Sequence, residues 1–150
     1  MPPTKVSRRG AIEWVVLEEL EMGLHPRAIS VVLLLVFELM KRGYRVCLST
    51  HSSQVLDALW ALKHLRENDA SPDALLDVFG APKSMYNLAE TVMTKTQKVY
   101  YFDRSTGVVK DISDLDPNAE EESESGWGGL SEFSGRANEA VARAVANSNK

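Results

Sequence analysis

The sequence predicts an α/β fold built on a parallel sheet, and three observations support this prediction. A run of β-branched and aromatic residues, Ile12–Leu17, is typical of a strand. A second such run follows at Tyr44–Leu48, and the segment Arg27–Arg42 between the two has apolar residues at helical spacing. Strand, helix and strand in this order imply a right-handed parallel crossover. We expect a β-hairpin and a terminal helix further along the chain.

The first predicted strand is apolar at nearly every position, which is the pattern of a strand buried on both faces of a parallel sheet. It ends in acid, because Glu18, Glu19 and Glu21 follow its last apolar residue. The sequence therefore predicts carboxylates at the carboxyl end of a buried strand.

The helix predicted over Arg27–Arg42 follows a loop that ends in proline, and Gly43 is its expected stop. Apolar residues surround more than half of its circumference, so the helix needs cover from two sides. The main apolar face consists of Ile29, Val32, Leu33, Val36, Leu39 and Met40, and Leu34, Leu35 and Phe37 lie off it.

Two further helices are expected after the second strand. The first runs from about Gln54 to Arg66, with Ser52 or Ser53 as its cap. The second is short: it begins at Ser71-Pro72-Asp73 and ends at Gly80. The apolar face of the first of these helices consists of Val55, Leu56, Leu59, Leu62 and Leu65.

The last third of the sequence predicts a hairpin, a linker and a helix. Lys98–Asp103 and Val108–Ile112 flank a turn that ends in Gly107, which suggests a hairpin on the edge of the sheet. The residues 113–126 are acidic and polar, as expected of a flexible linker. We therefore expect three parts: the parallel sheet with its helices and hairpin over 1–112, this linker, and a docked helix within 127–150. The docking residues would be Ala137, Val141, Ala144 and Val145.

Composition excludes several classes of protein. The net charge of −4 argues against binding nucleic acid over the whole surface, and no nucleic acid is indicated directly. No membrane span is expected, because the longest apolar run, Val31–Phe37, is far shorter than the ~20 residues that a membrane helix needs. No signal peptide is visible, and the single cysteine, Cys47, fits a reducing compartment. We expect a cytoplasmic protein.

Polar residues follow both predicted strands at the sheet edge where α/β proteins bind ligands. Two adjacent carboxylates after a buried strand suit a magnesium site and the activation of a water that attacks a phosphoryl group. Glu18 and Glu19 fit these two roles. A histidine after the neighbouring strand could donate a hydrogen bond to a terminal phosphate oxygen, and His51 fits that role.

These residues belong to a longer pattern that resembles the ABC-type ATPases of the AAA-like, OLD and RecF-like group. The segment Val15–Pro26, VVLEELEMGLHP, looks like the Walker B and D-loop region of that group. There, an apolar strand precedes acid-Glu-Pro-Glu, two variable residues and Leu-His-Pro, and Thr-His-Ser follows one helix and one strand later. Thr50-His51-Ser52 stands at that place in this sequence. The resemblance is strongest from Ile12 to Arg66.

The resemblance implies part of a P-loop NTPase sheet with flanking helices, and ATP bound with Mg²⁺ as the substrate. Glu18 would assist the Mg²⁺ through water, Glu19 would be the catalytic base, and His51 would be the switch histidine. The D-loop, which meets a second nucleotide-binding domain in this group, would consist of Gly23, Leu24, His25 and Pro26.

The sequence departs from the group's pattern in two ways. Leu20 replaces the usual proline after the catalytic pair, and Glu18 replaces the commoner aspartate. In addition, no GxxxxGK followed by Ser or Thr occurs, and the serine-glycine signature motif is absent as well. Because both motifs lie upstream of Walker B in this group, we expect a truncated product or a late start codon, or else a split protein whose other chain supplies the front half.

The sequence therefore favours a C-terminal fragment or half of an ABC-type ATPase, not competent alone, that works with a second ATPase domain or the missing N-terminal half. The alternative is a non-catalytic interaction or regulatory subunit that docks onto a partner with the phosphate loop. An exposed apolar face on the Arg27–Arg42 helix would favour that alternative. A third reading, a generic α/β domain without ATPase ancestry, predicts that Glu19 and His51 lie far apart.

Overall fold

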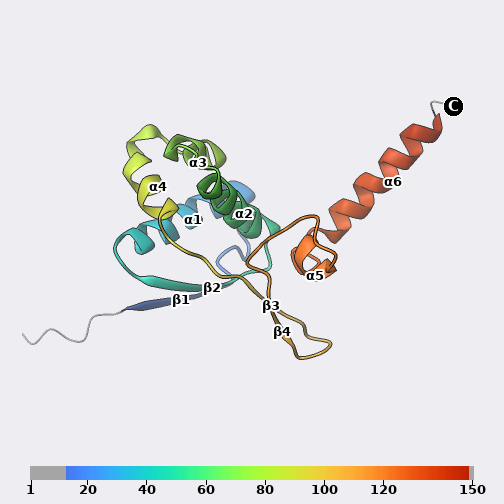
Figure 1. Ribbon diagram of the computed structural model, residues 1–150, viewed down its shortest axis with the longest axis horizontal. Helices are drawn as coiled ribbons and strands as arrows, with labels where there is room; N and C mark the ends of the chain where they lie inside the picture. The colour runs from blue at the N-terminus through green and yellow to red at the C-terminus, as the bar shows by residue number, and fades with distance from the viewer. Residues whose placement is uncertain (1–12, 149–150) are drawn as a thin grey trace, which may run out of the picture. The chain divides into compact units, whose positions relative to one another are not determined.

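The computed structural model describes residues 13–148 of the 150-residue chain (Figure 1). Ile12, the predicted start of the first strand, lies outside these residues. The chain forms two compact units, Met1–Thr50 and His51–Lys150. Both boundaries expected from the sequence, near residues 112 and 126, fall inside the second unit. The fold is α/β, as predicted.

The first unit consists of two parallel strands joined by a helix. Strand β1 is Trp14–Glu18, helix α1 is Pro26–Lys41 and strand β2 is Arg45–Ser49. In the register of the two strands, Trp14 lies opposite Arg45 and Glu18 lies opposite Ser49. The predicted strand, helix and parallel strand are confirmed.

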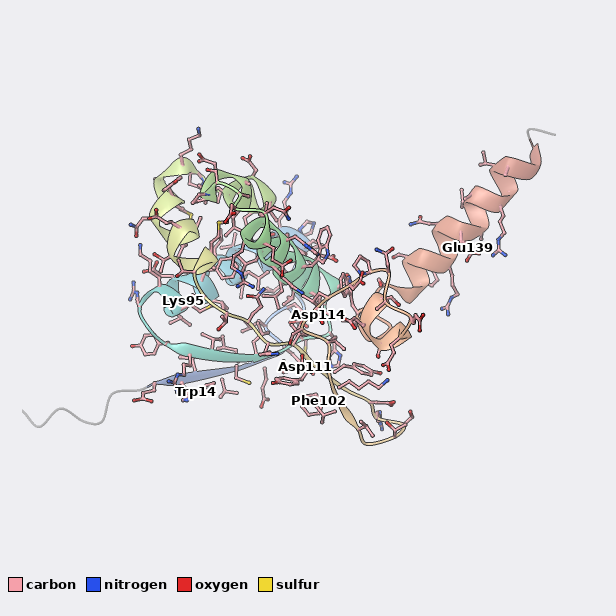
Figure 2. All side chains as sticks on the ribbon, in the orientation of Figure 1. Trp14, Lys95, Phe102, Asp111, Asp114 and Glu139 are labelled. Carbon is pink, nitrogen blue, oxygen red and sulfur yellow. The ribbon has the colours of Figure 1, made fainter. Side chains whose placement is uncertain are left out.

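One face of this two-stranded sheet is open to solvent. Trp14, labelled in Figure 2, is 56% exposed and Val16 is 67% exposed, whereas Val15 and Leu17 on the other face are half-buried. The prediction that the first strand is buried on both faces is therefore wrong, because Trp14 and Val16 on one face are both more than half exposed. Strands β1 and β2 alternate between exposed and half-buried positions instead.

Helix α1 has a cap at each end that the sequence encodes. The Arg27 backbone N–H donates to Nδ1 of His25, 3.2 Å away, and Pro26 occupies the first helical position, where no N–H is needed. At the other end Gly43 has a φ of +93°, and the Tyr44 N–H reaches back to the Leu39 carbonyl at 3.1 Å. This is the closure that glycine favours after a helix.

The buried face of α1 differs in part from the predicted one. Ile29, Leu33 and Val36 are buried as predicted, and so is Phe37, which was expected off that face. Phe37 lies one helical turn after Leu33, so the buried stripe is rotated toward it. Val31 and Leu35 lie on the opposite side and are 57% and 62% exposed. Helix α1 therefore has an exposed apolar side.

The second unit begins with four helical segments, α2 Ser53–Glu67, α3 Pro72–Phe79, the 3₁₀ turn η1 Lys83–Met85 and α4 Tyr86–Met93. The start and stop predicted for α3 are confirmed: the Ser71 side chain accepts from the Asp73 N–H, and Gly80 adopts a left-handed conformation. Helix α4 was not predicted, because no capping side chain marks its start.

A hairpin follows the helices. Strands β3, Tyr100–Phe102, and β4, Val109–Asp111, pair antiparallel with Phe102 opposite Val109. The hairpin is confirmed, but its predicted place on the edge of the parallel sheet is wrong. Among the described residues, β3 and β4 pair only with each other and form a separate sheet.

The hairpin, α2 and the segment after β4 share a hydrophobic core that contains Trp127. The indole Nε1–H of Trp127 donates to Asp57 on α2 at 2.9 Å, which satisfies the indole group while the ring is buried. Trp127 is therefore a core residue of the second unit. The buried members of this core are Leu56, Val99, Ile112, Leu115 and Trp127.

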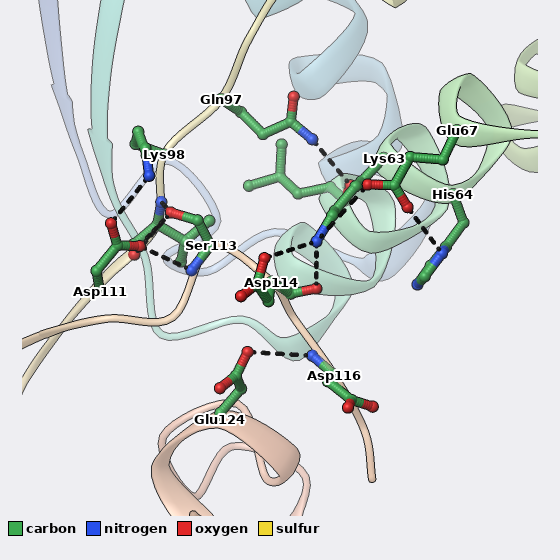
Figure 3. A network of polar contacts seen from close by, with 12 residues as sticks. Lys63, His64, Glu67, Gln97, Lys98, Asp111, Ser113, Asp114, Asp116 and Glu124 are labelled. Carbon is green, nitrogen blue, oxygen red and sulfur yellow. Dashed lines mark hydrogen bonds and ion pairs between the residues drawn. The ribbon is translucent and has the colours of Figure 1, made fainter. Parts of the chain in front are cut away.

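Polar contacts tie the strand ends of this unit to α2 (Figure 3). The ammonium group of Lys63 donates to the Asp114 backbone carbonyl at 2.9 Å and to its carboxylate at 3.1 Å. Across the hairpin, Lys98 donates to Asp111 at 3.0 Å. The first contact ties the region after β4 to α2, and the second ties the end of β4 to the segment before β3.

The segment 113–126, for which the sequence predicts a flexible linker, includes the short helix α5, Glu122–Ser125, and the fully buried Leu115. Its flexibility stays a prediction. The terminal helix is confirmed as α6, Glu132–Ser148, and every described side chain from Phe133 to Ala146 is exposed. Docking of α6 also stays a prediction. Of the helices formed by residues 13–148, none has the length and apolar character needed to cross a membrane.

Candidate active site at the end of the parallel strands

The carboxyl ends of β1 and β2 meet, and the candidate site residues of the first unit lie there. Glu18 is the last residue of β1 and lies opposite Ser49, the last residue of β2. One residue further, the Glu19 N–H donates to the Ser49 carbonyl at 3.0 Å, which continues the strand pairing beyond the sheet. The parallel register therefore brings the Glu18–Glu19 pair beside Ser49 and Thr50.

Glu18 lies on the open face of the sheet. Its position is exposed, as is that of Ser49 opposite it. Exposed and half-buried positions alternate along both strands, and the register places exposed residues opposite each other. The site thus offers a carboxylate and a hydroxyl on one surface that solvent and ligands reach. Sequence analysis did not single out Ser49, because its register with Glu18 depends on a pairing that no local pattern reveals.

Glu19 has an unusual backbone conformation. Its φ is +45°, in the left-handed region that residues with a Cβ atom rarely adopt. The Ser49 hydroxyl oxygen lies 3.4 Å from the Glu19 nitrogen and is a second acceptor for the same N–H. Such conformations cluster at functional sites, where the surrounding contacts hold the strain. Here the chain reverses direction directly after the carboxylate pair.

The segment after Glu19 is a compact turn that leads into α1. The Met22 N–H donates to the Glu19 carbonyl at 3.0 Å and the Leu24 N–H donates to the Glu21 carbonyl at 2.9 Å. Gly23 has a φ of +74°, which glycine adopts without strain. The four residues expected to form the D-loop therefore close this turn and cap α1, and all of them, Gly23, Leu24, His25 and Pro26, are exposed.

A side-chain contact links this turn to the end of β2. The Thr50 hydroxyl donates to the Glu21 carboxylate at 2.8 Å, and both residues are half-buried. Neither residue was assigned a role by sequence analysis. The signal that could have found them is the placement of Glu21 and Thr50 directly after the predicted ends of two neighbouring parallel strands.

His51 directly follows Thr50 and is the first residue of the second unit. It lies in the loop ahead of α2, and its position is exposed. Its accessibility suits a residue that contacts a ligand.

The oxygen donors of this sheet edge are of the kind that Mg²⁺ accepts. Mg²⁺ typically takes one or two carboxylates from a protein and completes its shell with water and substrate phosphate oxygens. Glu18 supplies such a carboxylate, with the Ser49 hydroxyl beside it. Within residues 13–148, no group of three or more His, Cys, Asp or Glu residues is arranged to hold a metal.

Comparison with known proteins relates the first third of the chain to a described family. A family described as "AAA domain, putative AbiEii toxin, Type IV TA system" matches residues 2–57. The matched segment includes β1, α1, β2 and the start of α2, and therefore both glutamates and His51. No curated protein and no solved structure matches the chain. The match indicates a nucleotide-binding, ATPase-like fold for this segment, and the α/β architecture is compatible with part of a P-loop NTPase.

Proposed function

We propose that this chain contributes the Walker B and switch-histidine part of an ABC-type ATPase site and does not hydrolyse ATP alone. The observation that supports this most directly is the parallel pairing of β1 with β2. It brings Glu18 and Glu19 to the same sheet edge as Ser49 and Thr50, the residues that lead into His51. In open α/β sheets, that edge is where ligands bind.

Glu18 and Glu19 have different surroundings, which suits different roles. Glu18 lies on the open sheet face and would hold Mg²⁺, through water, as the cation arrives with ATP. The cation would neutralise charge on the phosphates when bound. Glu19 follows in the left-handed backbone conformation, at the point where the strand ends and the turn begins. It would accept a proton from the water that attacks the terminal phosphate.

His51 and the exposed turn complete the proposal. The exposed imidazole of His51 would donate a hydrogen bond to a terminal phosphate oxygen, where negative charge increases during transfer. The turn 23–26 would meet a second nucleotide-binding domain, and the exposed Leu24 and Met22 provide apolar contact area for it. The sequence has no glycine-rich phosphate loop, so another polypeptide segment would supply it.

Calorimetric titration with ATP and Mg²⁺ tests this proposal. The chain would be compared with a version extended upstream to include any in-frame phosphate loop, or mixed with a partner that carries one. We expect binding only in the second case. Glu19→Gln should then leave ATP binding unchanged and reduce hydrolysis by at least about 100-fold, the scale of general-base catalysis. Tight binding of ATP by the 150-residue chain alone would overturn the proposal.

A second candidate function is favoured by the exposed apolar side of α1. Val31 and Leu35 are one turn apart and each more than half exposed, which suits a non-catalytic subunit that docks onto a partner with the phosphate loop. One measurement distinguishes the two functions. Catalysis by the assembled complex falls in Glu19→Gln if this chain is catalytic. If the chain is a docking module, catalysis falls only in the double variant Val31→Gln/Leu35→Gln, because that variant no longer associates with the partner.

A further inference from the structure

The turn after the carboxylate pair is held to β2 at two successive residues. At the first, the Glu19 N–H donates to the Ser49 carbonyl at 3.0 Å. At the second, the Thr50 hydroxyl donates to the Glu21 carboxylate at 2.8 Å. The first contact continues the backbone ladder, and the second is made by side chains 29 positions apart. Leu20 therefore lies between two anchored positions.

The Glu19 conformation requires such anchoring. A glutamate at a φ of +45° is strained, and strained residues persist only where the surrounding contacts determine them. The Glu21 contact is well suited to this task, because hydrogen bonds to an ionised acceptor are stronger than those between neutral groups and this one is partly buried.

We propose that Glu21 and Thr50 are positioning residues that keep Glu19 in its left-handed conformation and so fix the direction of its carboxylate. This inference rests on the proposed function, in which Glu19 is the catalytic base. Thr50 also precedes His51 directly, so the same hydrogen bond restrains the backbone that leads into the proposed phosphate-contacting residue. Neither positioning residue contacts the substrate in this proposal.

The test uses the full 150-residue chain and two readouts. The first is amide hydrogen exchange at Glu19 and Met22, whose N–H groups donate to the Ser49 and Glu19 carbonyls. Thr50→Val keeps the side-chain shape and removes the donor, so we expect exchange at both amides to accelerate about tenfold, as loss of one such hydrogen bond implies. Thr50→Ser should restore slow exchange. Thr91→Val is the matched control, because its hydroxyl donates at the same distance, 2.8 Å, to the Asn87 carbonyl in α4.

The second readout is NMR line broadening by Mn²⁺, used as a paramagnetic probe in place of Mg²⁺. In the unaltered chain, assembled with ATP and the phosphate-loop partner that the proposed function requires, we expect broadening at Glu18 and Glu19. In Thr50→Val and in Glu21→Gln, broadening at Glu19 should weaken while broadening at Glu18 persists. A role in overall stability alone would not separate the two residues in this way.

The possible results distinguish the positioning role of Glu21 and Thr50 from the proposed function of the site. Unchanged exchange at Glu19 in Thr50→Val, or uniform acceleration of all β1 and β2 amides in both Thr50→Val and Glu21→Gln, would overturn the positioning role. Accelerated exchange confined to the turn, without Mn²⁺ broadening in the unaltered chain assembled with ATP and its phosphate-loop partner, would support the positioning role and count against the proposed function. Broadening that is identical in all variants would support the function and overturn the positioning role.

Discussion

Glu19 combines a proposed catalytic carboxylate with a backbone conformation that favours glycine. The left-handed region costs a residue with a Cβ atom on the order of 1 kcal/mol, and Glu19 has a φ of +45°. The free energy of unfolding of Glu19→Gly should therefore be about 1 kcal/mol higher than that of Glu19→Ala. Both variants lose the carboxylate, and only the alanine variant keeps the backbone strain. Urea unfolding at neutral pH measures the difference. Equal stability of the two variants would show that the turn carries no strain.

Asp111 shows how a neighbouring hydroxyl can set the charge state of an exposed residue. The Ser113 hydroxyl and, next in importance, the ammonium group of Lys98 hold the pKa of Asp111 at about 2. Because folding lowers this pKa, ionised Asp111 stabilises the folded protein at pH values above the ordinary range of carboxyl pKa values. This stabilisation is lost as the pH falls toward 2. Ser113→Ala should raise the pKa of Asp111 toward its ordinary value. Carboxyl ¹³C NMR titration checks this, with Asp103, whose pKa of about 2 depends mainly on Ser105, as the unchanged internal control.

At the scale of the element, helix ends were predictable wherever a capping residue marks them. Ser71, Pro72 and Gly80 bound α3 in the structure as in the sequence, and Gly43 ends α1. Helix α4 has no such marker, since Met85 precedes it without a side-chain capping hydrogen bond. Capping residues therefore determined which helices could be predicted from the sequence. The face that each element buries depended on neighbours distant in sequence and was predicted only in part.

His25 was expected to belong to a D-loop, and its visible structural role is to cap α1. Its Nδ1 accepts from the Arg27 N–H, so a side chain without an acceptor leaves that donor to water. His25→Ala should lower the free energy of unfolding by about 1 kcal/mol, whereas His25→Asn should preserve most of it. Thermal unfolding of both variants distinguishes a cap from a contact residue. Equal losses in the two variants would indicate that His25 stabilises the protein by another contact.

Two glycines in the second unit differ in the space around them. Gly107 and Gly128 have φ values of +70° and +66°, so alanine is similarly strained at both. A Cβ at Gly128 would lie 2.5 Å from the Tyr101 ring, whereas one at Gly107 has nothing within 4 Å. Gly128→Ala should therefore cost roughly 1–3 kcal/mol more than Gly107→Ala, the usual penalty for overpacking. Chemical denaturation of the two variants isolates this steric term.

At the scale of the whole molecule, the sequence predicted the classes of element but not their grouping. Both strand pairs were foreseen, yet the hairpin was expected on the parallel sheet and instead forms its own. Which edges pair depends on contacts among distant segments, and a local pattern carries no information about them. The candidate site shows the same limit. Glu18 and Glu19 were visible as a motif, whereas the roles of Ser49 and Thr50 emerged only from the register.

The second unit contains a core and a polar network of its own, which leads to a prediction about fragments. Residues 51–150 include the Trp127 core and the Lys63–Asp114 contact. We expect this fragment to unfold cooperatively when expressed alone. Residues 1–50 should not, because a two-stranded sheet with one helix buries too little apolar surface. Circular dichroism during urea titration measures both, and a broad, non-cooperative transition for 51–150 would contradict the prediction.

The two sheets also differ in how much chain must be brought together before they form. Trp14 pairs with Arg45 across the whole of α1, whereas Tyr100 pairs with Asp111 across a short turn. The loop closed by the hairpin is roughly a third as long, which lowers its closure cost by roughly 1 kcal/mol. The hairpin should therefore form several times faster than the parallel pair. On this account the ends of β1 and β2, where the candidate site lies, are among the last parts of the molecule to acquire their structure during folding.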